Sequence, residues 1–114
     1  MFQNEVTILD TKKANKTGKT LNDIKKSLNK HRDVLEKRYK VKEIGVFGSC
    51  VRDERKRVSD IDILVDFEEV PSLLKFINLE RYLQRILRRK VDLVRRAALR
   101  EELKEIILEE VTYI

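Results

Sequence analysis

Residues 44–67 read IGVFGSCVRDERKRVSDIDILVDF, and this stretch decides the fold of the chain. Its first apolar run closes at Gly48 and Ser49, a pair typical of a strand that turns directly into a helix. Its second run, over residues 60–67, is rich in isoleucine and valine, which predicts another strand. Apolar side chains point to both faces of this second strand, so we expect it to be central in a sheet.

Helical patterns surround these two strands. Thr20 and Asp23 have the spacing of a capping box, with aspartate in place of glutamate, and apolar residues follow at helical intervals. Ser49 is a favourable N-cap for a short helix, and Pro71 with Ser72 opens a longer one. The expected elements are helices over residues 20–39, 50–56, 73–89 and 99–111, and strands over residues 42–47, 60–67 and 90–94.

This alternation of helices and strands predicts one layered domain of the α/β or α+β class over residues 20–114. The segment before it, residues 1–19, is loosely specified. Within that segment, residues 5–9 have the composition of a short strand and residues 12–19 form a basic, polar tract. A chain of 114 residues with 41% hydrophobic side chains suffices for one compact domain.

Charged residues make up 40% of the chain, against about 25% in an average soluble protein. The 26 lysines and arginines exceed the 20 aspartates and glutamates, and the charge of +6 favours acidic partners such as nucleotides or an acidic protein surface. No apolar run is long enough for a membrane span, and the N-terminus lacks a signal-peptide pattern. The single cysteine, Cys50, excludes an internal disulfide and a cysteine zinc cluster, so we expect a cytoplasmic protein.

Three aspartates stand within predicted strands, where a stable core does not ordinarily place charge. Asp60 and Asp62 lie two residues apart, so both side chains leave the same face of the sheet. Asp92 is the lone acid of an apolar strand. Close carboxylates repel each other, and a divalent cation such as Mg²⁺ removes that conflict. If the two strands are neighbours, the three side chains form a scaffold for two Mg²⁺ ions in phosphoryl or nucleotidyl transfer.

Gly48 and Ser49 supply the phosphate side of such a site. Glycine at a strand-to-helix turn lets the backbone approach a ligand closely, and the N–H groups that follow can bind phosphate oxygens. The hydroxyl of Ser49 adds one donor. Consecutive strands would therefore contribute an anion site and a metal site.

These residues resemble a known signature. Gly48 and Ser49, ten intervening residues, and then Asp60 and Asp62 match the GS-x10-DxD pattern of the DNA polymerase β-like nucleotidyltransferase superfamily. Residues 48–67 as a whole are similar to its minimal nucleotidyltransferase (MNT) branch.

The resemblance extends over residues 20–114. Arg52 falls where the MNT branch has arginine, residues 90–94 look like the strand with the third carboxylate, and residues 109–114 are similar to the usual end of these proteins. Asp53 departs from the pattern, because glycine is common at that position.

The resemblance implies a mixed β-sheet with helices packed mainly on one side. It implies that the metal and catalytic residues are Asp60, Asp62 and Asp92, and that the triphosphate is held by Gly48, Ser49 and Arg52. Asp92 would also help to deprotonate the acceptor hydroxyl. By the same resemblance, the chain is an Mg²⁺-dependent antitoxin that transfers AMP from ATP to a tyrosine of a HEPN-domain toxin, which is its partner.

Other interpretations stay open for several residues. Asp92 can pair with an arginine, and Arg52 and Arg55 can merely coat a helix. The basic stretch over residues 81–100 is either a solvated surface or a docking site for an acidic partner. His31 is expected to pack rather than to catalyse.

Rival functions also stay open. A protein of the same fold can neutralise its toxin by contact alone, without chemistry, or can transfer the nucleotidyl group to a small molecule. The charge of +6 raises a third possibility, a nucleic-acid-binding domain. We rank it last, because the motif for RNA strand recognition is absent, and expect neither a membrane nor a specific nucleic acid as partner.

Overall fold

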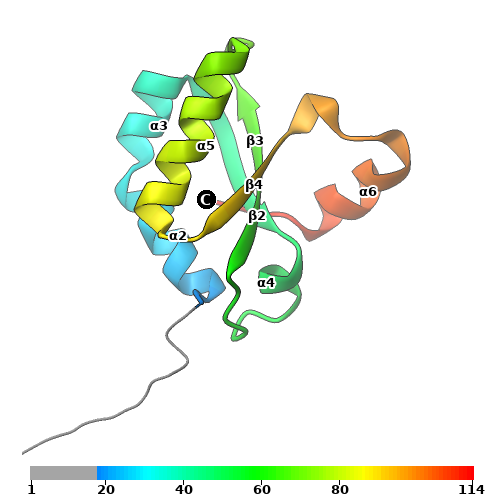
Figure 1. Cartoon of the computed structure of the whole chain (residues 1–114). Coiled ribbons are helices and arrows are strands. Elements are labelled where there is room, and N and C mark those ends of the chain that lie inside the picture. The colour runs from blue at the N-terminus through cyan, green and yellow to red at the C-terminus, as the bar shows by residue number, and fades with distance from the viewer. Residues whose placement is uncertain (1–17) are drawn as a thin grey trace, which may run out of the picture.

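Four strands form one mixed sheet in the order β4-β3-β2-β5 (Figure 1). The structure is a computed structural model and describes residues 18–114. The strands are β2 (Val41–Phe47), β3 (Asp60–Phe67), β4 (Lys90–Arg95) and β5 (Thr112–Tyr113). β3 pairs antiparallel with β2 and parallel with β4, whereas β2 pairs antiparallel with β5. The predicted mixed sheet, with β3 inside it, is confirmed.

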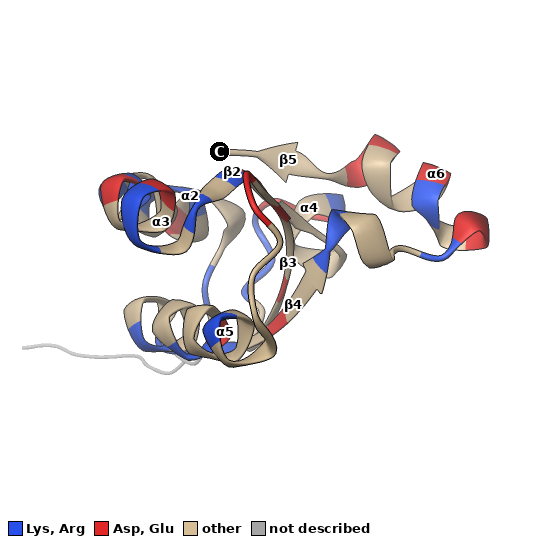
Figure 2. Cartoon of the chain, turned by 90° about the horizontal axis from the view of Figure 1, so that it is seen from above, with Lys and Arg blue, Asp and Glu red and all other residues tan. Residues whose placement is uncertain are grey.

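Three helices, α2 (Leu21–Lys30), α3 (Arg32–Tyr39) and α5 (Leu73–Leu87), cover one face of this sheet (Figures 1 and 2). The core lies between them and the strands. β3 contributes Ile61 and Ile63 to it, and both are fully buried. Because residues alternate along a strand, Asp60 and Asp62 leave β3 on the opposite face, away from the helix layer.

The helix predicted over residues 20–39 is interrupted at His31, so that α2 and α3 are separate. The His31 ring Nδ1–H donates to the Ser27 carbonyl oxygen at 2.8 Å, and the backbone N–H of His31 turns to the Leu28 carbonyl at 3.2 Å. The ring thus binds the Ser27 carbonyl, which would accept from the His31 backbone N–H in an unbroken helix. The His31 ring also packs against the Tyr82 ring of α5 in a T-shaped arrangement, with ring centroids 5.9 Å apart, as a packing residue would. The predicted capping box is present, with Thr20 and Asp23 bonded reciprocally.

The other face of the sheet carries α4 (Ser49–Arg52), the 3₁₀ turn η2 (Arg96–Ala98) and α6 (Glu101–Glu110), and Figure 2 shows α6 projecting outward on this side. No residue of α6 is buried, and Leu103 and Ile106 are 46% and 60% exposed. The helix predicted over residues 99–111 therefore exists in shorter form, but its apolar side chains do not join the core.

The strand β5 was not predicted. It has only two residues, which pair with Gly45 and Val46 of β2, and the N–H of Ile114 extends the pairing to the Ile44 carbonyl at 2.9 Å. Gly45 permits this approach, because a Cβ on it would lie 2.7 Å from the Val111 side chain.

The predicted strand over residues 5–9 and most of the basic tract over residues 12–19 lie outside the described residues. Lys19, at the end of that tract, forms an isolated bridge with Val58. Among residues 18–114 no helix combines the length and the apolar character that crossing a bilayer requires.

Candidate active site

The three predicted aspartates lie near one another on the sheet face opposite α2, α3 and α5. In the parallel register of β3 and β4, Asp62 is the direct partner of Asp92, and Asp60 is the partner of Lys90. Neighbouring strands lie about 4.8 Å apart, so the side chains of Asp62 and Asp92 leave adjacent points of the same face. Within residues 18–114, Asp92 forms no ion pair, so the alternative that an arginine neutralises it is not observed.

All three carboxylates line one open cavity of about 380 Å³. Its remaining lining residues are Glu80 and Gln84 of α5 and Lys90 and Val91 of β4, so the cavity reaches round the edge strand β4 to the helix layer. Gln84 is anchored there, because its side-chain oxygen accepts from the Val91 N–H at 3.1 Å. Glu80 brings a fourth carboxylate to the rim. No sequence pattern indicated a role for Glu80, because an acid on an amphipathic helix is ordinarily a solvated residue.

The surroundings of Asp62 disfavour its charged form. Burial raises the pKa of its carboxyl, and the neighbouring charges of Asp92 and Asp60 raise it further. Arg52 opposes this shift, and Glu110 adds to it. The site therefore concentrates negative charge on a half-buried group, which costs the protein stability unless a cation is bound.

The donor set suits a hard divalent cation, which prefers anionic oxygen ligands. As they stand, no three histidine, cysteine, aspartate or glutamate side chains of residues 18–114 converge closely enough to hold a metal ion. The mutual repulsion that raises the pKa of Asp62 also favours separation of these carboxylates when no cation lies between them. In the chemistry of their donor atoms, Asp60, Asp62 and Asp92 fit a hard divalent cation such as Mg²⁺.

The turn between β2 and α4 brings the predicted phosphate site against Asp62. Phe47 is the register partner of Asp62, and Gly48 follows with a φ of 86° and a ψ of −154°, a conformation that is essentially restricted to glycine. A Cβ on Gly48 would lie only 2.3 Å from Asp62 Oδ2. Glycine is therefore required here both for the backbone angle and for the space that the carboxylate occupies.

The helix that follows this turn differs from the prediction. Ser49 is the first residue of α4 rather than its cap, and no side chain caps this helix. α4 ends at Arg52 instead of near residue 56, because Asp53 bonds the Arg55 N–H at 3.2 Å and residues 52–57 are all exposed. Nothing apolar in this stretch supports further helical turns.

Cys50 follows the turn and is buried. Burial, and then the charge of Asp62, raises the pKa of the Cys50 thiol to about 11. A thiol in this state is a packing group and a poor nucleophile.

Glu110, the last residue of α6, completes the surroundings of the turn. The Gly48 N–H donates to Glu110 Oε1 at 2.7 Å, and Arg52 Nη1 donates to Glu110 Oε2 at 2.9 Å. Arg52, predicted to bind phosphate, is therefore within the site but paired with a carboxylate. Sequence reasoning assigned Glu110 no role. Residues 109–114 resembled the usual end of the family, but nothing in the sequence reveals that α6 returns to the turn.

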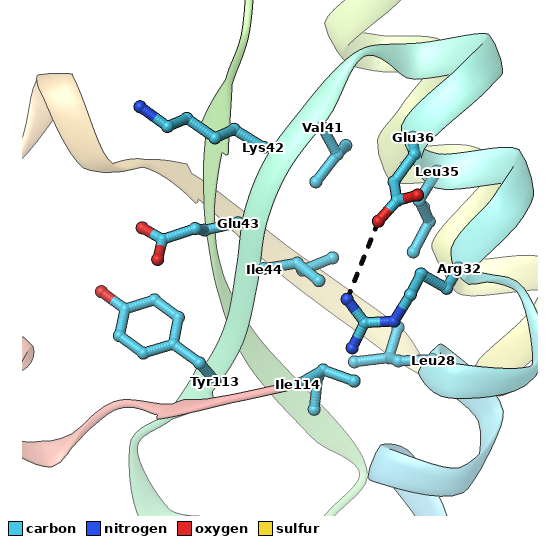
Figure 3. Close-up of a pocket in the computed structure, with 10 residues that line it drawn as sticks. All are labelled: Leu28, Arg32, Leu35, Glu36, Val41, Lys42, Glu43, Ile44, Tyr113 and Ile114. Carbon is cyan, nitrogen blue, oxygen red and sulfur yellow. Dashed lines mark ion pairs between the residues drawn. The ribbon is translucent and has the colours of Figure 1, made fainter.

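Two of the cavities outside this site border the helices α2, α3 and α5. One, of about 230 Å³, lies between β2 and the α2–α3 pair, where β5 is too short to cover the strand edge; Figure 3 shows Arg32 and Glu36 forming an ion pair there. The other, of about 570 Å³, lies on the helix layer, and its lining residues are Arg38, Tyr39, Lys75, Asn78, Arg81 and Arg85. The predicted basic stretch thus contributes Arg81 and Arg85 to a basic hollow on α5, away from the carboxylates.

Comparisons with known proteins agree with this geometry. A family model described as a nucleotidyltransferase domain matches residues 28–114. The chain is 53% identical to the protein adenylyltransferase MntA of Thermococcus cleftensis over 95 residues, which are 83% of this chain and 96% of that protein.

Solved structures give the same relationship. The chain is similar to a structure described as a minimal nucleotidyltransferase, with a TM-score of 0.63, 34% identity, and coverage of 79% of this chain and 94% of that one. It is also similar to a chain in a toxin-antitoxin structure with AMP-PNP, with a TM-score of 0.59, 28% identity, and coverage of 81% and 69%.

Proposed function

The chain belongs to the nucleotidyltransferase domain family, in its minimal branch, and on this premise we propose that it transfers AMP from ATP to a tyrosine of a HEPN-domain toxin. The observation that carries the proposal is the register of β3 and β4, which brings Asp62 beside Asp92 and leaves Asp62 against the Gly48 turn. An acidic site and an anion-binding turn are thereby joined in one place. The family relationship to MntA, and the likeness to a toxin-antitoxin structure with AMP-PNP, support the choice of ATP and of a toxin as partner.

The acidic residues have the first task in this proposal. Asp60, Asp62 and Asp92 would hold Mg²⁺, in two ions, and the metal would supply charge neutralisation and orientation of the triphosphate. Asp92 is exposed at the rim of the cavity, on the edge strand β4 of the sheet. From there a carboxylate oxygen of Asp92 accepts the proton of the acceptor hydroxyl. The hydroxyl oxygen attacks the α-phosphorus in line, and pyrophosphate leaves.

The turn has the second task. The Gly48 N–H and the Arg52 guanidinium, which both donate to the Glu110 carboxylate at the start of α4, bind oxygens of the leaving β- and γ-phosphates. We assign the same task to the hydroxyl of Ser49, the first residue of α4. They hold the triphosphate while charge develops on the leaving group. The cytoplasm contains ATP and keeps cysteine thiols reduced, and we propose that the protein works there. We assign the nucleotidyltransferase domain to residues 20–114 and leave residues 1–19 outside it.

Incubation with the HEPN toxin, ATP and Mg²⁺, followed by intact-mass measurement, tests the proposal. We expect the toxin to gain one or more AMP units. Asp62→Asn should abolish the gain while leaving the fold as stable or more stable, because it removes a like charge from a half-buried cluster. Asp66→Asn is the matched control, because Asp66 lies on the same strand, outside the cavity, and should retain activity. An unmodified toxin in the wild-type reaction would refute the transfer.

A second candidate is neutralisation of the toxin by contact alone. One observation favours it: among residues 18–114 no acidic cluster is assembled to bind a metal before the substrate arrives. The double variant Asp60→Asn/Asp62→Asn separates the two functions. Toxin activity that remains suppressed by this variant supports contact alone, whereas a loss of suppression supports transfer.

A further inference from the structure

Glu110 occupies the anion position of the Gly48 turn. Its two carboxylate oxygens have separate donors, the Gly48 N–H at 2.7 Å and Arg52 Nη1 at 2.9 Å. Both distances are those of strong, charge-assisted hydrogen bonds. These donors are also the groups proposed above to bind phosphate oxygens, so the carboxylate and a triphosphate cannot use them at the same time.

The two partners of Glu110 differ in how firmly they are fixed. Gly48 is buried and its backbone follows β2 directly, so its N–H stays at the turn whether or not Glu110 is present. The Arg52 side chain is 64% exposed and the Glu110 side chain 18% exposed. Arg52 can therefore exchange one anionic partner for another without disturbing the core.

The segment that carries Glu110 is weakly attached. No residue of α6 is buried, and Figure 1 shows the helix standing away from the sheet before the chain returns to β2. The return is made by β5, whose two residues pair with Gly45 and Val46. Segments with few buried apolar side chains open at low free-energy cost, so α6 can lift from the turn while β5 remains paired.

Electrostatics favours departure of Glu110 when nucleotide binds. The triphosphate is highly anionic, and Glu110 is an additional negative charge near the acidic cluster, where it adds to the rise in the pKa of Asp62. A bound triphosphate would repel Glu110 and would replace it on Arg52 and Gly48.

We propose that Glu110 is an internal competitor of the nucleotide: its carboxylate holds the phosphate-binding donors in the free protein, and ATP binds only after Glu110 and the end of α6 have left the turn. This inference rests on the proposed function, since it assigns the same donors to the triphosphate. Glu110 then sets the apparent affinity for ATP, because that affinity is reduced by the fraction of molecules in which the turn is open. It also couples nucleotide occupancy to the position of α6, whose exposed apolar side chains include Leu103 and Ile106.

Binding of ATP with Ca²⁺ in place of Mg²⁺, measured by calorimetry on the full chain, tests the competition. We expect Glu110→Ala to bind ATP about tenfold more tightly than the wild type, and Glu110→Gln to fall between them because the amide oxygen keeps one acceptor. Glu109→Gln is the control, because the neighbouring acid is exposed and should leave the affinity unchanged. Equal or weaker binding by Glu110→Ala would overturn the inference. Failure of every one of these proteins, the wild type included, to bind ATP would instead refute the proposed function.

Hydrogen exchange provides a second measurement. ATP should increase the amide exchange of residues 101–110 in the wild type, and Glu110→Ala should show that faster exchange without ATP. Unchanged or slower exchange of α6 in the ATP-bound wild type would mean that Glu110 stays in place, which would overturn the inference even if ATP binds tightly.

Discussion

Substitution of Gly48 by alanine tests the most constrained contact of the site. The backbone at Gly48 has a φ of 86° and a ψ of −154°, and an added Cβ would lie 2.3 Å from Asp62 Oδ2. Alanine must therefore either distort the turn or push the Asp62 side chain out of its place. Both responses affect stability, and the second also displaces the central carboxylate.

The cost can be divided between these two causes. A residue other than glycine in this sparsely populated backbone region costs on the order of 1–3 kcal/mol. Moving Asp62 away from its preferred rotamer costs about 1 kcal/mol more. We therefore expect Gly48→Ala to lower the free energy of unfolding by about 3 kcal/mol, a drop in Tm on the order of 15 °C for a domain of this size.

Urea denaturation of four proteins measures both terms: the wild type, Gly48→Ala, Asp62→Ala and the double variant. In the Asp62→Ala background the carboxylate is gone, so Gly48→Ala should cost only the backbone term, and the coupling free energy should be about 1 kcal/mol. A loss below about 0.5 kcal/mol for Gly48→Ala in the wild-type background would be within the range of an ordinary surface substitution and would refute the reasoning. A coupling free energy of zero would refute the predicted contact with Asp62 but not the backbone cost.

Three further predictions concern residues outside the turn. Thr20→Ala removes the capping bond to the Asp23 N–H and should lower the free energy of unfolding by about 1 kcal/mol in urea titrations, whereas exposed Asn22→Ala should have little effect. The hydrogen bond from the Thr20 N–H lowers the pKa of Asp23 below 3.8. The stability that Asp23 adds is therefore complete above about pH 5 and is lost as the pH falls through 3.8 toward the folded-state pKa. The difference in free energy of unfolding between the wild type and Asp23→Asn, measured by denaturation at several pH values, should shrink in that window and stay constant above it. With a pKa of about 11, the Cys50 thiol is about one part in a thousand thiolate at pH 8, so a thiol reagent should label it only upon unfolding, and rapid labelling of the native protein would contradict its burial.

Local patterns allowed correct prediction of the elements that surround the site. β3 lies where the isoleucine- and valine-rich run predicted it, over Asp60–Phe67, and the capping box at Thr20 opens α2 as expected. The grouping of Asp60 and Asp62 on one face follows from the period of two along a strand. The nucleotidyltransferase family was likewise identified from a short, contiguous pattern, residues 48–62, because its spacing joins two adjacent strands.

Two errors involve contacts, or missing contacts, with parts of the chain that are distant in sequence. His31 interrupts a helix because its ring takes the Ser27 carbonyl and packs on Tyr82, a residue far along the chain. Leu103 and Ile106 have helical spacing but no core to join, since α6 projects from the sheet.

The sequence by itself determined the strands β2, β3 and β4, the position of the glycine turn and the placement of two acids on one face, because each depends on residues within a few positions of one another. The tertiary structure decided which strand lies beside β3, and so brought Asp92 into register with Asp62. It also decided that Glu110 returns across 62 positions of sequence to bond Gly48. Such contacts depend on how sheet and helices pack as a whole, and a pattern of neighbouring residues does not encode them individually.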